Sequence, residues 1–263
     1  MSLMMKDRET PFQEGHMREG EWQARCDLAA AYRLVAMFGW DDLIGTHLSA
    51  RIPGTHDEFL INPLGQMFDE ITASSLVKVN MDGEILQNTP FTINKAGFVI
   101  HSAVHAARND VDCVIHLHTR DGVAVSATDT GLLPLNQSAM VILPHIARHA
   151  YEGVAINEEE RERLVADLGG KPMMLLDNHG TLCVGSTVGE AFNYIYMLEW
   201  ACSTQVRTLS MGLPIRRADP QVVHNTGELL MVDNLEQFKA IVSDLVWPAL
   251  LRKLDRTNPG YRE

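Results

Sequence analysis

Two histidines, His116 and His118, lie one residue apart in the segment CVIHLHTRD, which begins at Cys113. The β-prone side chains of residues 111–118 predict a largely buried strand. Residues i and i+2 of a strand point to the same side, so both imidazoles leave one face roughly 7 Å apart, and one metal ion can bridge them once the rings turn inward. Leu117 should point to the opposite face, into the core. The pair is therefore a candidate metal site.

A third candidate ligand is His179, in the turn DNHGT between two strand-like runs. It is far from His118 along the chain, so only the fold can bring the two together. Three neutral imidazoles around an open position are typical of a catalytic zinc, which polarises a substrate oxygen. Packing remains an alternative, because a chain with 11 histidines will contain chance pairs. A second pair, His101 and His105, lies on one face of a predicted helix among alanines and Val104, and this pair we assign to packing.

Composition limits the classes of function. With 263 residues and 46% hydrophobic side chains, the chain can bury a sizeable core. Its net charge of −12 and pI of about 5.3 exclude a general attraction to nucleic acid or to anionic membranes. The N-terminus is polar and no apolar run approaches the ~20 residues of a membrane span, so we expect a cytoplasmic protein. Four cysteines without C-x-x-C spacing predict buried thiols.

Regular turn signals without repeats predict a polar arm over residues 1–21 and a single domain over 22–263 with a C-terminal helical extension. Strands come in runs flanked by helices, without steady alternation, which favours an antiparallel or mixed sheet. The predicted helices are 22–38, 95–108, one after Asn157, 187–212 with a capping box at Thr187 and Glu190, and 235–256. The predicted strands are 46–52, 59–62, 77–80, a stretch around Ile85, 111–118, 173–177 and 181–184.

Three segments together carry a resemblance that covers residues 22–213: CDLAAAYRLVAMFGWDDLIGTHLSAR, INKAGFVIHSAVHAARNDVDCVIHLHTRDGVAVSA and LLDNHGTLCVG. They resemble the class II aldolase/adducin family. The resemblance implies an α/β fold, a three-layer α/β/α sandwich with a mostly antiparallel central sheet. It also implies a homo-oligomer, with a tetramer favoured and the active site near a subunit interface. In the family's aldolases and epimerases, residues at the positions of His116, His118 and His179 hold zinc or another divalent metal.

The chain departs from the aldolase pattern at the start of the helix before the H-x-H motif. Aldolases of the family carry an acidic general base where this chain has Gly97. Their phosphate loops are only partly kept, because His47 replaces an asparagine, Leu64 a threonine, and Lys95 with Ala96 a serine pair. The segment NKAGFVIHSAVHAAR is closer to the adducin head, a non-enzymatic module, although adducin heads lack the complete set of three metal-binding histidines. The residues that match the substrate-binding loops are His47, Asn62, Gly65 and Lys95.

Proton transfer must then come from another group. Tyr151 and Glu152 in AYEG are the predicted catalytic residues, and Arg120 with Asp121 could also reach the site. Taken alone, Tyr151 and Glu152 have a simpler reading as a packed turn, and Lys95 as a solvated residue at a helix start. Asp177 is a candidate second-shell carboxylate, because metal-bound histidines usually donate their other N–H to an acceptor.

We therefore expect a metal-dependent lyase-type enzyme that acts on a small anionic hydroxy-carbonyl compound. The reaction would be aldol cleavage or decarboxylation through a metal-stabilised enediolate. A non-catalytic binding or scaffold protein like the adducin head is the alternative. Two runs, MVILP at 140–144 and FNYIYMLEW at 192–200, carry more large apolar groups than one helix face needs, which favours a homo-oligomer.

Overall fold

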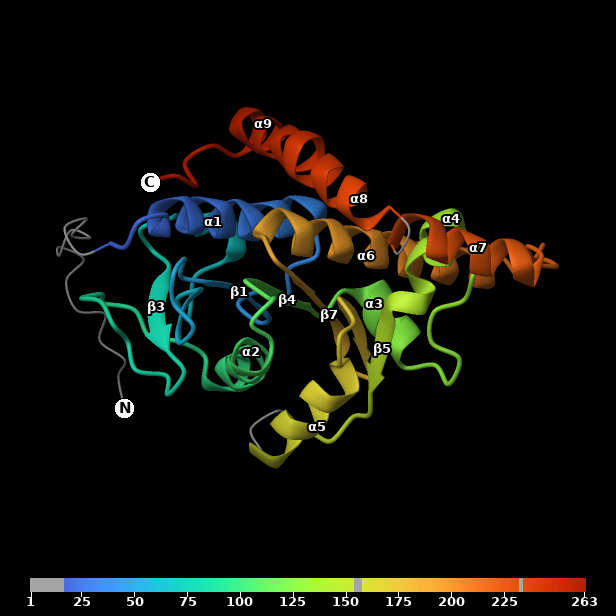
Figure 1. Cartoon of the computed structure of the whole chain (residues 1–263), viewed down its shortest axis with the longest axis horizontal. Helices are drawn as coiled ribbons and strands as arrows, with labels where there is room; N and C mark the ends of the chain where they lie inside the picture. Colours follow the sequence, from blue (N-terminus) through green and yellow to red (C-terminus); the bar gives the residue numbers. More distant parts are fainter. Residues whose placement is uncertain (1–16, 154–157, 232–233) are drawn as a thin grey trace.

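A seven-stranded sheet forms the centre of the computed structural model, which describes residues 17–153, 158–231 and 234–263 (Figure 1). The strand order is β3-β2-β1-β4-β7-β6-β5. Every neighbouring pair is antiparallel except β5 with β6, so the predicted mostly antiparallel sheet is confirmed. The strands are β1 His47–Arg51, β2 Glu58–Ile61, β3 Val77–Asn80, β4 Cys113–Leu117, β5 Ile146–His149, β6 Met173–Leu176 and β7 Gly180–Gly185.

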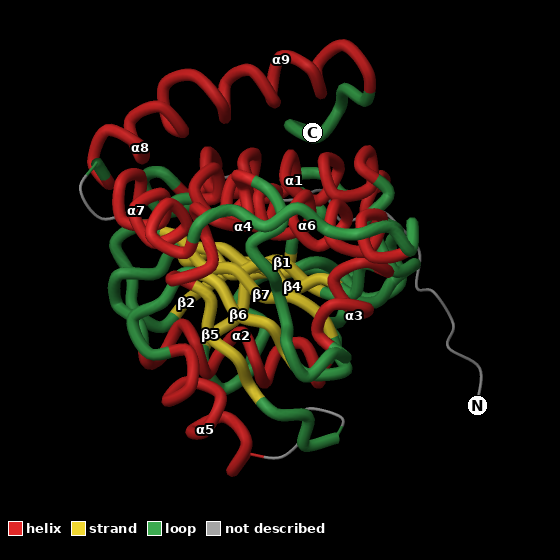
Figure 2. Tube along the Cα trace, turned by 90° about the vertical axis from the view of Figure 1, so that its right-hand side faces the viewer, coloured by secondary structure: helices red, strands yellow, loops and turns green. Residues whose placement is uncertain are grey.

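Helices cover both faces of the sheet, which confirms the predicted α/β/α sandwich. Helices α1 (Glu21–Phe38) and α6 (Val188–Ser210) lie on one face, and α2 (Lys95–Ala107) and α5 (Glu158–Leu168) lie on the other (Figure 1). Helices α8 (Leu235–Ile241) and α9 (Trp247–Thr257) form a further layer outside α1 and α6 (Figure 2). The C-terminal extension thus packs on the sandwich rather than on the sheet.

Alternating side chains along β4 build two separate cores. Ile115 and Leu117 belong to the core beneath α1 and α6, and Leu117 is fully buried as predicted. Val114 belongs to the core beneath α2 and α5. Because the period of a strand is two residues, His116 leaves β4 on the same side as Val114. The H-x-H motif therefore faces the α2 and α5 layer at the end of the strand.

The predicted elements recur with shifts of one or two residues at most ends, but four elements were missed. These are α3 (Arg120–Ser126), α4 (Gln137–Ile142), β5 and α7 (Pro220–Met231). The first three have four to seven residues, too short for a clear hydrophobic period. The predicted strand near Ile85 is a single bridge to Val79. The last predicted helix is broken by a π-helical turn at Val242–Val246.

The end of α1 leads the chain toward the histidines. Gly39 adopts a left-handed conformation with φ 70°, and its N–H bonds to the carbonyls of Val35 and Ala36, which closes the helix. At the start of α6, Thr187 accepts from the Glu190 N–H, but the Glu190 carboxylate accepts from Ser186 instead of returning to Thr187. Only half of the predicted capping box is therefore present.

Within the described ranges, no helix combines the length and the hydropathy needed to cross a bilayer.

Candidate metal centre

Three histidines from two parts of the chain converge at the end of β4. The Nε2 atoms of His116 and His118 lie 3.0 Å apart. One ring nitrogen from each of the three histidines, His179 included, lies within 4.8 Å of the other two. The three ring centroids are 4.7 to 4.8 Å apart. Nitrogens around a tetrahedral zinc lie about 3.3 Å apart, given Zn–N bonds near 2.0 Å. The group thus needs only small ring movements to hold one ion.

Two of the three imidazoles have an acceptor for their other nitrogen. His116 Nδ1 lies 3.0 Å from the Thr181 carbonyl, and His118 Nδ1 lies 3.1 Å from the Asp42 carboxylate. Donation from Nδ1 leaves each Nε2 lone pair directed at the common point, as in many metal centres. The predicted role of Asp177 is wrong in this structure. Its carboxylate accepts from Arg148 rather than from a ligand histidine.

Burial keeps His116 and His179 uncharged at neutral pH. It lowers the pKa of His116 well below the usual value, and the neighbouring His179 and His118 lower it further. Burial also lowers the pKa of His179 to about 4, with His118 as the second cause. Neutral imidazoles are the form that binds a metal, so at neutral pH no proton must leave these two residues first.

The turn before β7 is built so that His179 can reach the pair. Asn178 adopts a left-handed conformation with φ 56°, which asparagine tolerates better than most residues. A Cβ on Gly180 would lie 2.3 Å from the Leu117 carbonyl, so only glycine allows β7 to approach β4 this closely. The H-G sequence is thus a steric requirement as well as a motif.

His47 fills the space above Gly97. A Cβ added at Gly97 would lie 2.2 Å from His47 Nδ1 and 2.3 Å from Cε1. His47 is buried, neither ring nitrogen has a hydrogen-bond partner among the described residues, and burial lowers its pKa to about 4, with His118 as a second cause. It pairs with His116 across the β1–β4 ladder, so its side chain leaves the same face of the sheet beside the cluster.

The other residues of the predicted substrate loops lie around the start of α2. Asn62 is buried, and its Oδ1 accepts from the Tyr32 hydroxyl at 2.9 Å. Gly65 turns the following loop with φ 95°. A hydrogen bond from Leu64 N to the Thr92 carbonyl joins this loop to the segment before α2, where Lys95 is exposed. The loops are therefore adjacent, but the Asn62 side chain is already hydrogen-bonded to Tyr32 in the core.

The two predicted catalytic residues differ in their placement. The Tyr151 ring is 6.5 Å from the His179 ring and the residue is 54% exposed, so its hydroxyl can meet a ligand at the cluster. The Glu152 carboxylate instead forms an ion pair with Arg163 on α5. His101 and His105 share the Ser49 hydroxyl at 2.6 and 2.8 Å inside the core, which confirms their assignment to packing.

Glu199 on α6 supports the cluster and was not singled out from the sequence. Its carboxylate accepts from the hydroxyls of Thr119, which follows His118, and of Thr181, whose carbonyl binds His116. Burial raises its pKa to about 7, against the effect of the two hydrogen bonds. A glutamate inside an apolar helix was the available signal, because such a residue needs a buried partner.

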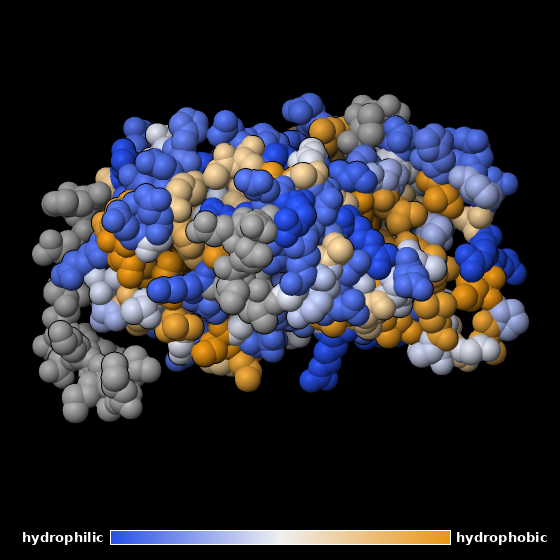
Figure 3. Space-filling model, turned by 90° about the horizontal axis from the view of Figure 1, so that it is seen from below, coloured by the Kyte–Doolittle hydropathy of each residue, from blue (hydrophilic) through white to orange (hydrophobic). Residues whose placement is uncertain are grey.

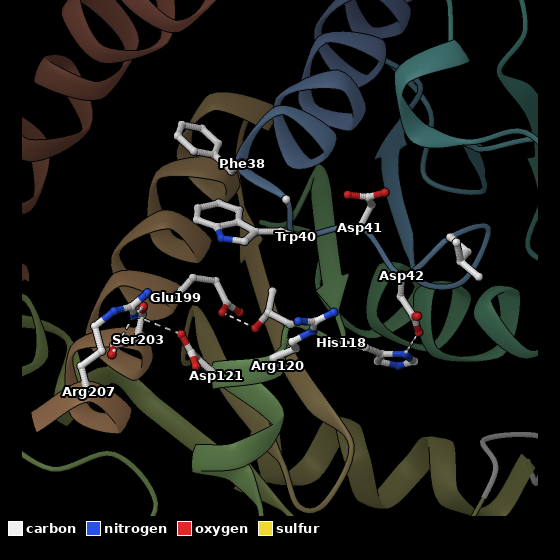
Figure 4. A pocket seen from close by; sticks show the side chains of 13 residues that line it. Phe38, Trp40, Asp41, Asp42, His118, Arg120, Asp121, Glu199, Ser203 and Arg207 are labelled. Carbon is white, nitrogen blue, oxygen red and sulfur yellow. Dashed lines mark hydrogen bonds and ion pairs between the residues drawn. The ribbon is translucent and has the colours of Figure 1, made fainter. Parts of the chain in front are cut away.

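A cavity of about 730 Å³ adjoins the cluster at His118 (Figure 4). The loop after α1, including Trp40 and Asp42, forms one side, and Glu199 on α6 lies on the other. Arg120 lies between Glu199 and His118 (Figure 4). Of the three histidines, His118 borders this cavity, whereas His116 and His179 do not line it. The sequence did not predict this cavity, because its walls are far apart in the chain.

Comparisons with known proteins agree with this architecture. The family model described as Class II Aldolase and Adducin N-terminal domain matches residues 26–206. The crystal structure of an aldolase II superfamily protein from Pseudomonas syringae is 45% identical, with a TM-score of 0.88 over 96% of this chain and 100% of that one.

Two further relatives differ in what their names imply. L-fuculose 1-phosphate aldolase from Glaciozyma antarctica is 26% identical, with a TM-score of 0.79 over 97% of both chains. Alpha-adducin from Rattus norvegicus is 47% identical over 195 residues, which are 73% of this chain and 26% of that protein. The chain is thus similar to a named aldolase and, at higher identity, to part of alpha-adducin.

The contact between His47 and Gly97 predicts opposite effects of one substitution in two backgrounds. Gly97→Ala should lower the free energy of unfolding of the wild type by about 1–3 kcal/mol, because its Cβ overpacks the imidazole. In a His47→Ala background, Gly97→Ala should instead raise the free energy of unfolding by up to about 1 kcal/mol, because alanine is a better helix former than glycine. Chemical denaturation of the four proteins measures both effects. The same sign in both backgrounds would contradict the contact.

The raised pKa of Glu199 predicts a pH-dependent loss of stability. Between its ordinary pKa of 4.5 and about 7, the unfolded chain loses this proton while the folded chain keeps it. The free energy of unfolding should therefore fall as pH rises through this window, by up to about 3 kcal/mol, and Glu199→Gln should remove this component. Urea denaturation from pH 4.5 to 8 measures it, with the exposed Glu236→Gln as control. Parallel curves for wild type and Glu199→Gln would refute the assignment.

Proposed function

Because this chain belongs to the class II aldolase and adducin N-terminal domain family, we propose that it is a metal-dependent carbon–carbon lyase. Its substrate would be a small, unphosphorylated, anionic hydroxy-carbonyl compound, cleaved by an aldol-type or decarboxylation reaction. The observation that carries the proposal is the convergence of His116, His118 and His179, two of them with acceptors for the second nitrogen.

The donor set fits a zinc or similar divalent ion. Three imidazoles leave at least one coordination position for a ligand, which is typical of catalytic rather than structural zinc. When bound, such an ion would act as a Lewis acid toward substrate oxygens. Thr181 and Asp42 would orient His116 and His118, and Glu199 would hold the two threonines beside them.

The residues around the cluster supply contacts for the substrate. His47 presents two buried nitrogens without a partner among the described residues, so a ligand that offers both an acceptor and a donor would satisfy them. Of the two predicted catalytic residues, the geometry favours Tyr151 for proton transfer, because Glu152 is engaged by Arg163. Lys95 and Gly65 are exposed at the surface around the start of α2.

Gly97 argues against a conventional sugar phosphate. The carboxylate that the aldolase pattern places there could not be accommodated, because His47 occupies its space. Loss of a general base typically lowers the rate about 10²- to 10⁴-fold. A reaction that needs no base at this position, such as decarboxylation, is compatible with the site as it stands.

We also propose that the protein is a homo-oligomer, with a tetramer favoured. The run 140–144 no longer supports this, because Val141 and Ile142 are buried within the chain. In the run 192–200, Trp200 is 57% exposed. Hydrophobic side chains also gather near the end of the molecule where α6 leads to α7, on the right of Figure 3, and Met211 and Leu213 are exposed in this segment.

An adducin-like scaffold without activity is the second candidate function. The 47% identity to alpha-adducin, against 26% to L-fuculose 1-phosphate aldolase, supports it. A scaffold module does not need converging histidines whose second ring nitrogens are held by acceptors. Metal binding therefore distinguishes the two candidate functions.

The purified protein should carry about one divalent ion per chain. His118→Ala should lower the metal affinity by more than the 10- to 100-fold expected for loss of an outer partner, and Asp42→Ala should lower it by about that amount. His224→Ala, at an exposed position on α7, should have no effect. Elemental analysis and zinc titration of the folded variants measure this. A wild type that binds no metal would overturn the enzyme proposal and favour the scaffold.

Turnover of L-fuculose 1-phosphate should be at least about 10²-fold slower than that of a sugar-phosphate aldolase. The double variant Gly97→Glu with His47→Asn should raise it, because it restores the carboxylate and removes the ring in its way. Gly97→Glu alone should not, since the imidazole remains. A coupled assay on the metal-loaded proteins decides. Efficient cleavage by the wild type would show that another residue has replaced the base.

A further inference from the structure

The cavity beside His118 is separate from the predicted substrate loops, which lie around the start of α2. It extends from His118 along one face of α6, where Glu199, Ser203 and Arg207 recur at four-residue intervals. The opposite wall is the end of α1, with Phe38, and the segment after it, with Trp40. A volume of about 730 Å³ is within the range of small-molecule sites.

Most charged groups in this cavity are already engaged. Asp42 binds His118, Asp121 pairs with Arg207 at 3.3 Å, and Glu199 accepts from two threonines. Within residues 17–153, 158–231 and 234–263, the Arg120 guanidinium has no hydrogen bond or ion pair. It lies between Glu199 and His118 (Figure 4). Arg120 is therefore the available cation of the cavity, two residues from a ligand histidine.

We propose that Arg120 binds the carboxylate of an unphosphorylated polyhydroxy carboxylic acid that occupies this cavity. The proposal rests on the metal centre of the proposed function and deepens it by naming the substrate class. A guanidinium presents a planar fork that matches a carboxylate with two parallel hydrogen bonds. A hydroxyl next to that carboxylate would then lie toward His118.

The charges of the cavity select this class over a phosphate ester. Asp41, Asp42 and Asp121 line the same space as Arg120, so a dianionic group would face several carboxylates with one available cation. A monoanion matches the single guanidinium. The same carboxylates accept hydrogen bonds from hydroxyl groups, and Trp40 offers an apolar surface to the carbon chain. A carboxylate at one end and hydroxyls along the rest satisfy both sets of groups.

The test uses the zinc-loaded full chain and three probes that share a carbon skeleton: gluconate, glucitol, which has no carboxylate, and glucitol 6-phosphate. We expect gluconate to bind more tightly than either other probe in isothermal titration calorimetry. Arg120→Gln should weaken gluconate binding at least tenfold and leave glucitol binding unchanged, whereas Arg120→Lys should recover part of the loss because it keeps the charge. Arg217→Gln, an exposed arginine outside the cavity, is the matched control.

Zinc content and the melting temperature are measured on every sample, so the two proposals fail in different ways. A wild type without zinc binding overturns the metal centre. If zinc binds, the Arg120 proposal is overturned by absence of gluconate binding, by equal affinities for gluconate and glucitol, by tighter binding of glucitol 6-phosphate, or by unchanged affinity in folded Arg120→Gln.

Discussion

The pairing of β4 between β1 and β7 is the constraint on which the site depends. In this ladder His47 lies opposite His116, and His116 lies opposite Leu182. A slip of one residue would turn every side chain of β4 to the other face and move His116 into the core beneath α1 and α6. The two hydrophobic cores bury alternate residues of β4 and therefore hold the candidate metal ligands in register.

Several polar groups around this frame are buried, and burial affects each of them differently. His116 and His179 are kept neutral by it, so they remain available as ligands at neutral pH. Glu199 is held in a dry position by two hydroxyl donors, which ties α6 to the residues beside His118 and His116. The cost of burying Glu199 is offset only if both threonines stay in place.

Much of the fold could be predicted because the long elements carry clear periods. The local sequence directly shows the hydrophobic patterns of helices α1, α2 and α6 and of the strands on either side of the H-x-H motif. Short elements such as α3 and β5 lack a full period, and α7 was overlooked. The convergence of His179 on the H-x-H pair came from a resemblance rather than from spacing. Asp42, Glu199 and the Arg120 cavity could not be predicted, because their partners meet only through tertiary packing.

The interlock of His47 with Gly97 also bears on how such a chain could change over evolutionary time. An imidazole at 47 and any side chain at 97 exclude each other by contact. A descendant that gains a carboxylate at 97 must therefore first shrink the residue at 47, and one that gains the imidazole must first have glycine at 97. The order of the two mutations is set by sterics, so the path between the two arrangements runs through an intermediate that has neither group.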